Sequence, residues 1–451
     1  MATSENVALI NAPSKNQYFT ELLPPVGLLY LASYLRRNNI NVFFNELNVA
    51  KNWRGELARF IRGQSFPIIG ISSNVSNYNQ TLEIASLIKT ISKNTKVVVG
   101  GPHPSITPGE YMHPDIDYII PFEGEQAMLD LVRNSNGNTV EGVIYCRQGD
   151  CDGQYSRIKR RFIHDLDDVP FPAYDMIDLK PYYSSAYKKR PIVSMVTSRG
   201  CTYKCVFCSQ TVSGGRWRAR SPENVVAEMQ WLKDIGVKEI SIEDDNFTFD
   251  IKRIFKICDL MQSAKLKIVW QLGNGVRADR LTKELLRAMK DAGCWKLAIA
   301  PEVGDDETLK KVRKGMMLDQ FRQAARWCKK LNIVYYGYFS MGFPFETKDS
   351  MEQTIQFALE LDPLLMDLSK IIPFPGTELY AKFPAKERYQ ENISYFYNSG
   401  NAVLDKMFKK AYFKFYLRPH KIIEIMRRIG FKQFLAFVIF GVRIILKKKG
   451  K

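Results

Sequence analysis

Three cysteines lie close together in the sequence, and their spacing suits metal binding. Cys201, Cys205 and Cys208 follow a C-x3-C-x2-C pattern directly after a predicted strand at 192–197. Ordinary cubane clusters take four thiolates. With three thiolates, one iron of a four-iron, four-sulfur cluster stays open and can bind the amino and carboxylate groups of S-adenosylmethionine. One electron passed to the sulfonium can then break a C–S bond and give a 5′-deoxyadenosyl radical.

Two other interpretations of the cysteines fit less well. A zinc knuckle would need a fourth Cys or His close by, whereas His164 and His420 are far away in sequence. A ferredoxin-like electron carrier would need four cysteines and a much shorter chain. The spacing therefore favours an open [4Fe-4S] cluster.

The elements around the cysteines predict an α/β domain with the cluster loop at one end. Six strands alternate with helices, which fits a partial barrel whose reactive groups lie at the carboxyl ends of the strands. The expected strands are 192–197, 239–243, 269–272, 296–300, 334–340 and 368–372.

A second α/β domain precedes this one. Its five strands alternate with helices and imply a doubly wound parallel sheet, which binds ligands beyond the carboxyl ends of its strands. We expect the strands at 7–10, 42–44, 68–72, 97–99 and 118–120. Turns after the last two contain Gly100-Gly101 and Glu123-Gly124, and small residues there let a bulky ligand approach the backbone.

The sequence predicts four segments. Residues 1–140 form the first domain, 141–190 a hairpin around Asp150–Gly153 and a linker, 191–385 the barrel, and 386–451 a basic helical tail.

Several stretches resemble one family across nearly the whole chain. They are the cysteine loop, Pro-Pro-Val-Gly-Leu-Leu-Tyr-Leu-Ala at 24–32, Gly-Gly-Pro-His-Pro at 100–104 and Phe-Glu-Gly-Glu at 122–125. The chain resembles the cobalamin-dependent radical S-adenosylmethionine enzymes, which include methyltransferases and anaerobic magnesium-protoporphyrin ester cyclases. The resemblance implies a Rossmann-like cobalamin domain followed by a radical S-adenosylmethionine barrel.

The resemblance also implies roles for single residues of the barrel. Phe207 would lie against the adenine, Asp244 and Asp245 near the methionine part, and Glu302 against S-adenosylmethionine. Asp244 and Asp245 could instead begin a helix, as Asp often does after a strand. Because the cofactors carry the difficult chemistry, no side chain is assigned a catalytic role.

In the first domain, Gly100, Gly101, Glu123 and Gly124 are the expected cobalamin-binding residues. Many cobalamin domains carry an Asp-x-His-x-x-Gly loop, but residues 11–17 contain no His. We therefore expect cobalt without a protein imidazole, and we expect His103 to form hydrogen bonds within its loop. Methylthiotransferases resemble this family in the barrel, but their N-terminal domain supplies three further cluster cysteines. The first domain of this chain has no cysteine, so we do not expect a methylthiotransferase.

The tail is basic and partly apolar. Residues 405–451 contain ten Lys and four Arg against two acidic residues, and 434–446 is almost wholly apolar. That stretch is too short to span a bilayer. An interfacial helix on anionic lipid and a helix packed on the barrel both stay open. Nucleic-acid binding is not expected, and the absence of a signal peptide favours the cytoplasm.

Three functions stay open at this point. The leading one is methylation of an unactivated carbon on a small hydrophobic substrate, such as a lipid or isoprenoid-like molecule. The second keeps both cofactors for a cyclisation or rearrangement, and the third is a non-catalytic binding protein. An enzyme of this kind would take its electrons from an external donor such as flavodoxin or ferredoxin.

Overall fold

The computed structural model describes residues 6–14, 22–134, 138–184, 186–384, 401–431, 433–435 and 438. It divides into two compact units. The first comprises residues up to 17, 25–181 and 209–218, and the second comprises 18–24, 182–208 and the chain from 219 onward. The segment Ser209–Arg218 thus belongs to the first unit, although it directly follows the three cysteines.

The first unit is built on a six-stranded sheet with the strand order β2-β1-β3-β4-β5-β6. All pairs are parallel except β5 with β6. The five predicted parallel strands are confirmed. The strands are β1 (Asn6–Asn11), β2 (Asn41–Glu46), β3 (Ile68–Ser72), β4 (Lys96–Gly100), β5 (Tyr118–Ile120) and β6 (Ile144–Tyr145). The helices are α1 (Val26–Arg37), α2 (Trp53–Gly63), α3 (Tyr78–Ile91), α4 (Pro102–Ile106), α5 (Glu125–Arg133) and α6 (Cys151–Arg157).

The hairpin predicted around Asp150–Gly153 is wrong. Strand β6 pairs with β5, and the helix α6 follows after a short 3-10 helix at Cys146–Gln148. The Asp150 side chain accepts a hydrogen bond from the Gly153 backbone N–H at 3.1 Å and so caps this helix. Tyr155 and Ile158 pack against the core of the unit. The cap and the apolar packing therefore override the turn-like composition of this stretch.

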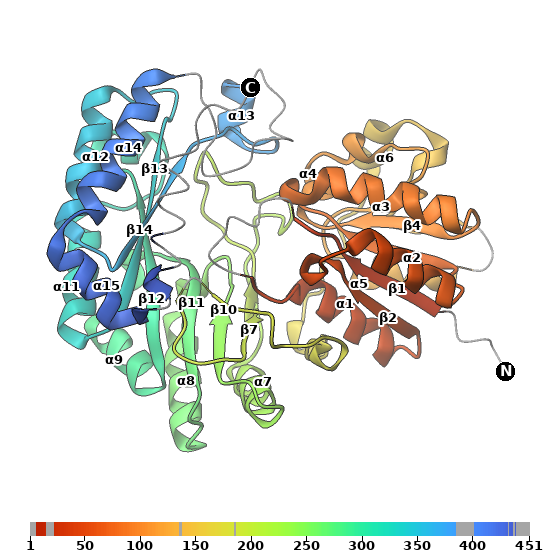
Figure 1. Cartoon of the computed structure of the whole chain (residues 1–451), viewed down its shortest axis with the longest axis horizontal. Coiled ribbons are helices and arrows are strands. Elements are labelled where there is room, and N and C mark those ends of the chain that lie inside the picture. The colour runs from red at the N-terminus through yellow and green to blue at the C-terminus, as the bar shows by residue number, and fades with distance from the viewer. Residues whose placement is uncertain are drawn as a thin grey trace. The chain divides into compact units, whose positions relative to one another are not determined.

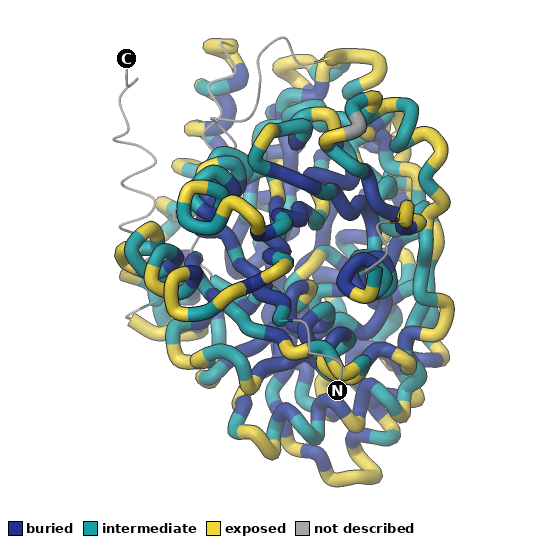
Figure 2. The backbone as a smooth tube through the Cα atoms, turned by 90° about the vertical axis from the view of Figure 1, so that its right-hand side faces the viewer, coloured by how far each residue is buried: buried dark blue, intermediate teal, exposed yellow. Residues whose placement is uncertain are grey.

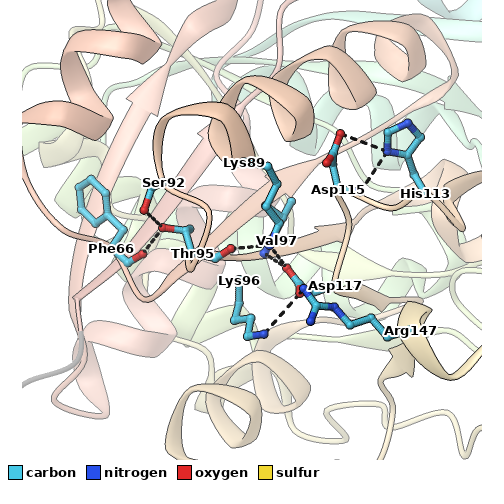
Figure 3. Close-up of polar contacts among 10 residues, drawn as sticks. All are labelled: Phe66, Lys89, Ser92, Thr95, Lys96, Val97, His113, Asp115, Asp117 and Arg147. Atoms are coloured by element: carbon cyan, nitrogen blue, oxygen red, sulfur yellow. Dashed lines mark hydrogen bonds and ion pairs between the residues drawn. The ribbon is translucent and has the colours of Figure 1, made fainter.

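Asp117 holds the amino ends of β4 and β5 together (Figure 3). Its buried carboxylate lies 2.5 Å from Lys89 Nζ and accepts a hydrogen bond from the Val97 backbone N–H at 2.9 Å. Although burial raises its pKa, these hydrogen bonds and the charges of Lys89 and Lys96 hold the pKa of Asp117 below its ordinary value. Ligands of such sheets bind at the opposite edge, so this network contributes stability.

The second unit contains an open parallel sheet with the order β14-β13-β12-β11-β10-β7, which confirms the predicted partial barrel. Its strands are β7 (Ile192–Met195), β10 (Glu239–Ile242), β11 (Val269–Val276), β12 (Cys294–Glu302), β13 (Val334–Met341) and β14 (Leu365–Lys370). A separate two-stranded sheet is formed by β8 (Ser198–Arg199) and β9 (Arg218–Ala219).

Helices line the outer face of the second sheet (Figure 1). They are α7 (Pro222–Asp234), α8 (Ile251–Ser263), α9 (Lys283–Asp291), α11 (Leu318–Leu331), α12 (Lys348–Leu361), α14 (Ala402–Tyr416) and α15 (Pro419–Ile429). The unit also contains the short helices α10 (Asp306–Lys311) and α13 (Glu378–Lys382). Five of the long ones begin at side-chain caps, which satisfy N–H groups of the first turn. The caps are Ser221, Asp250, Thr282, Thr347 and Asn401. Figure 2 shows buried strands and exposed outer helix turns.

Helix α14 covers the exposed edge of β14. The Tyr416 hydroxyl accepts a hydrogen bond from the Met366 N–H at 2.9 Å and donates one to the Met366 carbonyl at 2.7 Å. These bonds replace those of a further strand and protect the sheet edge. Helix α15 packs against the same unit through Ile425 and Ile429. The predicted apolar stretch 434–446 lies outside the described residues except for 434, 435 and 438.

Candidate cofactor site

The structure places the three cysteines on the loop that follows β7 and β8. The loop is fixed at its middle because Val206 donates a backbone hydrogen bond to the Val312 carbonyl at 3.1 Å and accepts one from Leu379 at 2.8 Å. Before Cys201, Gly200 has a φ of 92°, which a side chain would strain. The loop is thus fixed through Val206 to two other segments of the second unit.

Asp244 fixes the start of this loop. It is 3% exposed, and its carboxylate accepts three hydrogen bonds of 2.6 Å, from the N–H and hydroxyl of Thr197 and the hydroxyl of Ser198. Burial raises its pKa, and these hydrogen bonds oppose the rise. Asp244 therefore holds the end of β7. The sequence had led us to consider cofactor binding or a helix cap for this residue, and not this role.

The neighbouring residues reach the cysteine loop directly. Asp245 accepts a hydrogen bond from the Gly200 N–H at 2.8 Å, and the Asn246 amide nitrogen lies 3.9 Å from the Cys201 sulfur. The end of β10 therefore supports the loop that follows β7, as neighbouring strand ends of a parallel sheet can.

The three thiols are free and influence one another. Cys208 is exposed as a whole residue, yet burial of its thiol and the nearby thiols of Cys205 and Cys201 raise the pKa of Cys208 to about 11. Burial also raises the pKa of Cys205, while the Lys314 ammonium lowers it. A positive group beside the thiols favours their ionised, metal-binding form.

This donor set fits a cubane cluster better than a single metal ion. Among the described residues, no three His, Cys, Asp or Glu side chains gather closely enough to hold one ion. The thiolates of a cubane bind three different irons, so they stand farther apart than the ligands of one zinc ion. The residues present thus fit a [4Fe-4S] cluster with one open iron.

Glu302 lies at the end of β12, and its ion-pair partner Lys314 lies near Phe207 of the cysteine loop. Its carboxylate lies 2.6 Å from Lys314 Nζ and accepts a hydrogen bond from the Ser340 hydroxyl at 3.1 Å. Its φ of 70° is unusual for a residue other than glycine and marks a constrained backbone. Lys314 Nζ also lies 5.8 Å from the centre of the Phe207 ring, which in turn packs edge-on against Phe343.

Sequence inspection missed Lys314 and Arg277. The Arg277 guanidinium stacks 3.5 Å from the centre of the Tyr203 ring and donates hydrogen bonds to the carbonyls of Lys314 and Gly315. Lys314 follows the helix α10, and a search for ligand-binding residues at the ends of strands does not include positions after helices. Arg277 directly follows β11, so a search for cations after each strand would have found it.

In the first unit, the two adjacent glycines have a packing role. A Cβ on Gly101, whose φ is 112°, would lie 2.5 Å from the Ser73 carbonyl oxygen, and one on Gly100 would lie 3.2 Å from the Ile120 oxygen. The turns after β3 and β4 can therefore approach closely only with glycine. Gly124 immediately precedes α5 and has ordinary space around it.

Glu123 contacts Arg218 and Ile163, and the sequence did not predict these contacts. Its carboxylate pairs with both terminal nitrogens of Arg218 and accepts a hydrogen bond from the Ile163 N–H at 2.9 Å. Both side chains of the pair are about nine-tenths buried, at 10% and 9% exposure. Glu123 therefore anchors the segment Ser209–Arg218 to the turn after β5.

His103 is a core residue, in agreement with the predicted hydrogen-bonding role. Its Nδ1 lies 2.8 Å from the Tyr111 hydroxyl, and its ring packs edge-on against Tyr78 and Tyr111. Burial lowers its pKa to about 4, so the ring is neutral. The ring is 2% exposed, and its Nε2 lies 3.6 Å from a carboxylate oxygen of Glu110.

Comparison with known proteins decides the family. Residues 18–132 match the B12 binding domain, and residues 195–358 match the Radical SAM superfamily. The chain is 31% identical over 424 residues to an uncharacterized methyltransferase from Pyrococcus horikoshii, covering 90% of this chain and 91% of the relative. The chain belongs to the B12-binding radical SAM family. It is a radical SAM enzyme, and the cofactors of the family are a [4Fe-4S] cluster, S-adenosylmethionine and cobalamin.

Other members of the family are more distant. The anaerobic magnesium-protoporphyrin IX monomethyl ester cyclase of Rubrivivax gelatinosus is 26% identical, over 80% of this chain and 67% of the relative. The solved structure of the methyltransferase TsrM from Kitasatospora setae superimposes with a TM-score of 0.70 at 18% identity, over 83% of this chain and 75% of that one. This likeness supports the two-unit fold.

Proposed function

We propose that this radical SAM enzyme is a cobalamin-dependent methyltransferase that acts on an unactivated carbon of a small hydrophobic substrate. The observation that carries the proposal is the likeness to the Pyrococcus horikoshii methyltransferase along nine-tenths of the chain. A hopanoid C-3 methylase from Methylococcus capsulatus, 25% identical, is a relative whose name indicates an apolar substrate.

The proposed site residues follow from the geometry of the cysteine loop. Cys201, Cys205 and Cys208 would hold three irons, while Asp244, Asp245 and Asn246 keep the loop in place. When bound, the cluster supplies one electron that cleaves the C5′–S bond of S-adenosylmethionine into methionine and a 5′-deoxyadenosyl radical.

Side chains around the loop would orient the cosubstrate. Phe207 offers an aromatic edge for the adenine, and the Glu302–Lys314 pair offers one negative and one positive group for the zwitterionic methionine part. In the first unit, the turns at Gly100-Gly101 and Glu123-Gly124 would lie against cobalamin. The enzyme would act in the cytoplasm and receive electrons from a flavodoxin or ferredoxin.

The proposal can be tested before the substrate is known. Anaerobic protein is reconstituted with iron, sulfide and cobalamin, reduced, and incubated with S-adenosylmethionine whose methyl group is deuterated. We expect 5′-deoxyadenosine, S-adenosylhomocysteine and a deuterated methyl group on the bound corrinoid, measured by mass spectrometry. Deoxyadenosine without S-adenosylhomocysteine would instead favour a cyclase or a rearrangement.

The matched cysteine variants are Cys205→Ser and Cys151→Ser. Both residues are partly buried, and Cys151 lies on α6 of the first unit. Cys205→Ser should lose the cluster absorbance, part of its iron and deoxyadenosine formation, whereas Cys151→Ser should keep all three. Normal deoxyadenosine formation by Cys205→Ser would overturn the site assignment.

A further inference from the structure

Exposed apolar side chains concentrate in the described part of the chain that contains α14 and α15 and the residues just after them. Among the described residues, eleven large apolar side chains are exposed, and seven of them lie between 403 and 438. These seven are Val403, Phe413, Leu417, Ile423, Phe431, Leu435 and Val438. A contiguous apolar surface on an otherwise polar exterior marks an interaction site more often than scattered residues do.

The helical spacing sorts α14 and α15 into an inner and an outer face. The inner face is buried through residues such as Met407, Phe415 and Ile425. Exposed residues recur at intervals of three or four along α14 and again along α15, with Leu417 between the two helices. Within each helix this spacing marks one face. We call these residues the outer stripe; it consists of Lys406, Lys409, Phe413, Leu417, His420, Ile423 and Arg427.

Positive charge accompanies the apolar residues of the outer stripe. Within the described part of the chain, exposed Lys406, Lys409, Arg427 and Arg428 form no ion pair. Other cations of these helices do have partners, such as Lys410, which lies beside Glu352. The stripe therefore presents uncompensated cations among apolar side chains, and the sequence adds six more basic residues after position 431 without an acidic one.

We propose that the outer stripe docks α14 and α15 peripherally on an anionic lipid bilayer. Basic and apolar residues on one helix face match the boundary between charged headgroups and acyl chains. A second copy of the chain is a poorer partner, because two positively charged stripes would repel each other. No helix among the described ones is long and apolar enough to cross a membrane. The proposal does not depend on which reaction the enzyme catalyses.

Vesicle cosedimentation of the full-length, cofactor-loaded protein tests the proposal. One set of vesicles is phosphatidylcholine alone, and the other is an equimolar mixture of phosphatidylcholine and phosphatidylglycerol. We expect binding to the anionic vesicles, weak binding to the neutral ones, and loss of binding as salt is raised. Absent or charge-independent binding would overturn the proposal.

Two variants separate the apolar and the electrostatic contributions. Leu417→Ser, which changes a side chain 65% exposed, should weaken binding by about tenfold, as expected for an apolar side chain that leaves water. Met317→Ser is the matched control, because Met317 is 64% exposed and lies before α11. The second variant, Arg427→Gln with Arg428→Gln, should weaken binding to anionic vesicles alone.

The other possible results would also overturn membrane docking or check that the variants are folded. Unchanged binding by Leu417→Ser and by the double Arg variant would overturn the proposal. Analytical ultracentrifugation without lipid tests whether a second copy of the chain binds the outer stripe. A dimer that Leu417→Ser dissociates would assign the stripe to self-association and refute membrane docking. Unchanged cobalamin and iron contents would show that the variants are folded.

Discussion

Glu346 gives the sharpest prediction, because its environment couples folding to pH. Its carboxylate accepts backbone hydrogen bonds from Gly342 at 2.7 Å and Phe343 at 2.8 Å. The other oxygen is buried without a hydrogen-bond partner among the described residues. Burial, opposed by these two hydrogen bonds and assisted by nearby Asp305, raises the pKa of Glu346 to about 7 from 4.5.

The sign and size of the effect follow from the two pKa values. Between pH 4.5 and about 7 the unfolded chain loses this proton while the folded protein keeps it, so the free energy of unfolding falls as pH rises. Above pH 7 both states are ionised and the loss is constant. The difference of about 2.5 pH units corresponds to at most about 3 kcal/mol.

Glu346→Gln should remove this dependence, since the amide stays neutral and its oxygen can still accept hydrogen bonds. Urea unfolding is followed anaerobically by circular dichroism from pH 5 to pH 8.5, and the variant is compared with wild type at each pH. We expect the variant to gain on wild type by up to about 3 kcal/mol as pH rises. Glu307→Gln is the control, because Lys311 lowers the pKa of Glu307 and keeps it ionised throughout this range. A constant difference between Glu346→Gln and wild type would refute the reasoning.

Three further predictions concern buried polar groups. Arg218→Gln removes the positive charge that neutralises buried Glu123 and should lower the free energy of unfolding by about 3–5 kcal/mol. Arg36→Gln breaks an exposed pair with Asp175 and should lower it by less than about 1 kcal/mol, so equal losses in urea unfolding would contradict this prediction. Asp244→Asn should lower the free energy of unfolding by about 2 kcal/mol and reduce the iron content after reconstitution. The control Asp250→Asn keeps its helix cap and should change neither the stability nor the iron content. His103→Phe should flatten the loss of stability between pH 6.5 and 4, where only the unfolded chain gains this proton. An unchanged slope in urea unfolding would contradict this.

The expected hairpin around Asp150 was wrong because it relied on composition alone. The stretch around Asp150 contains turn-forming residues, but a side-chain cap and the apolar contacts of Tyr155 stabilise α6. Gly100 and Gly101 were predicted to make room for a ligand, and the structure adds that they make room for the backbone of Ser73 and Ile120. A glycine signals close approach in both cases, and only the fold shows what approaches.

The cysteine spacing, with no fourth ligand nearby, determined the cluster chemistry from sequence alone, because ligand identity and number are local properties of the chain. Hydrophobic periodicity likewise determined the strands of both sheets and their order along the chain. The tertiary structure decided what supports the site: Asp244 reaches back to Thr197, Lys314 to Glu302, and Glu123 to Arg218. Those partners are 12 to 95 positions apart in sequence, and no local pattern encodes a pairing that depends on how separate strands and loops pack.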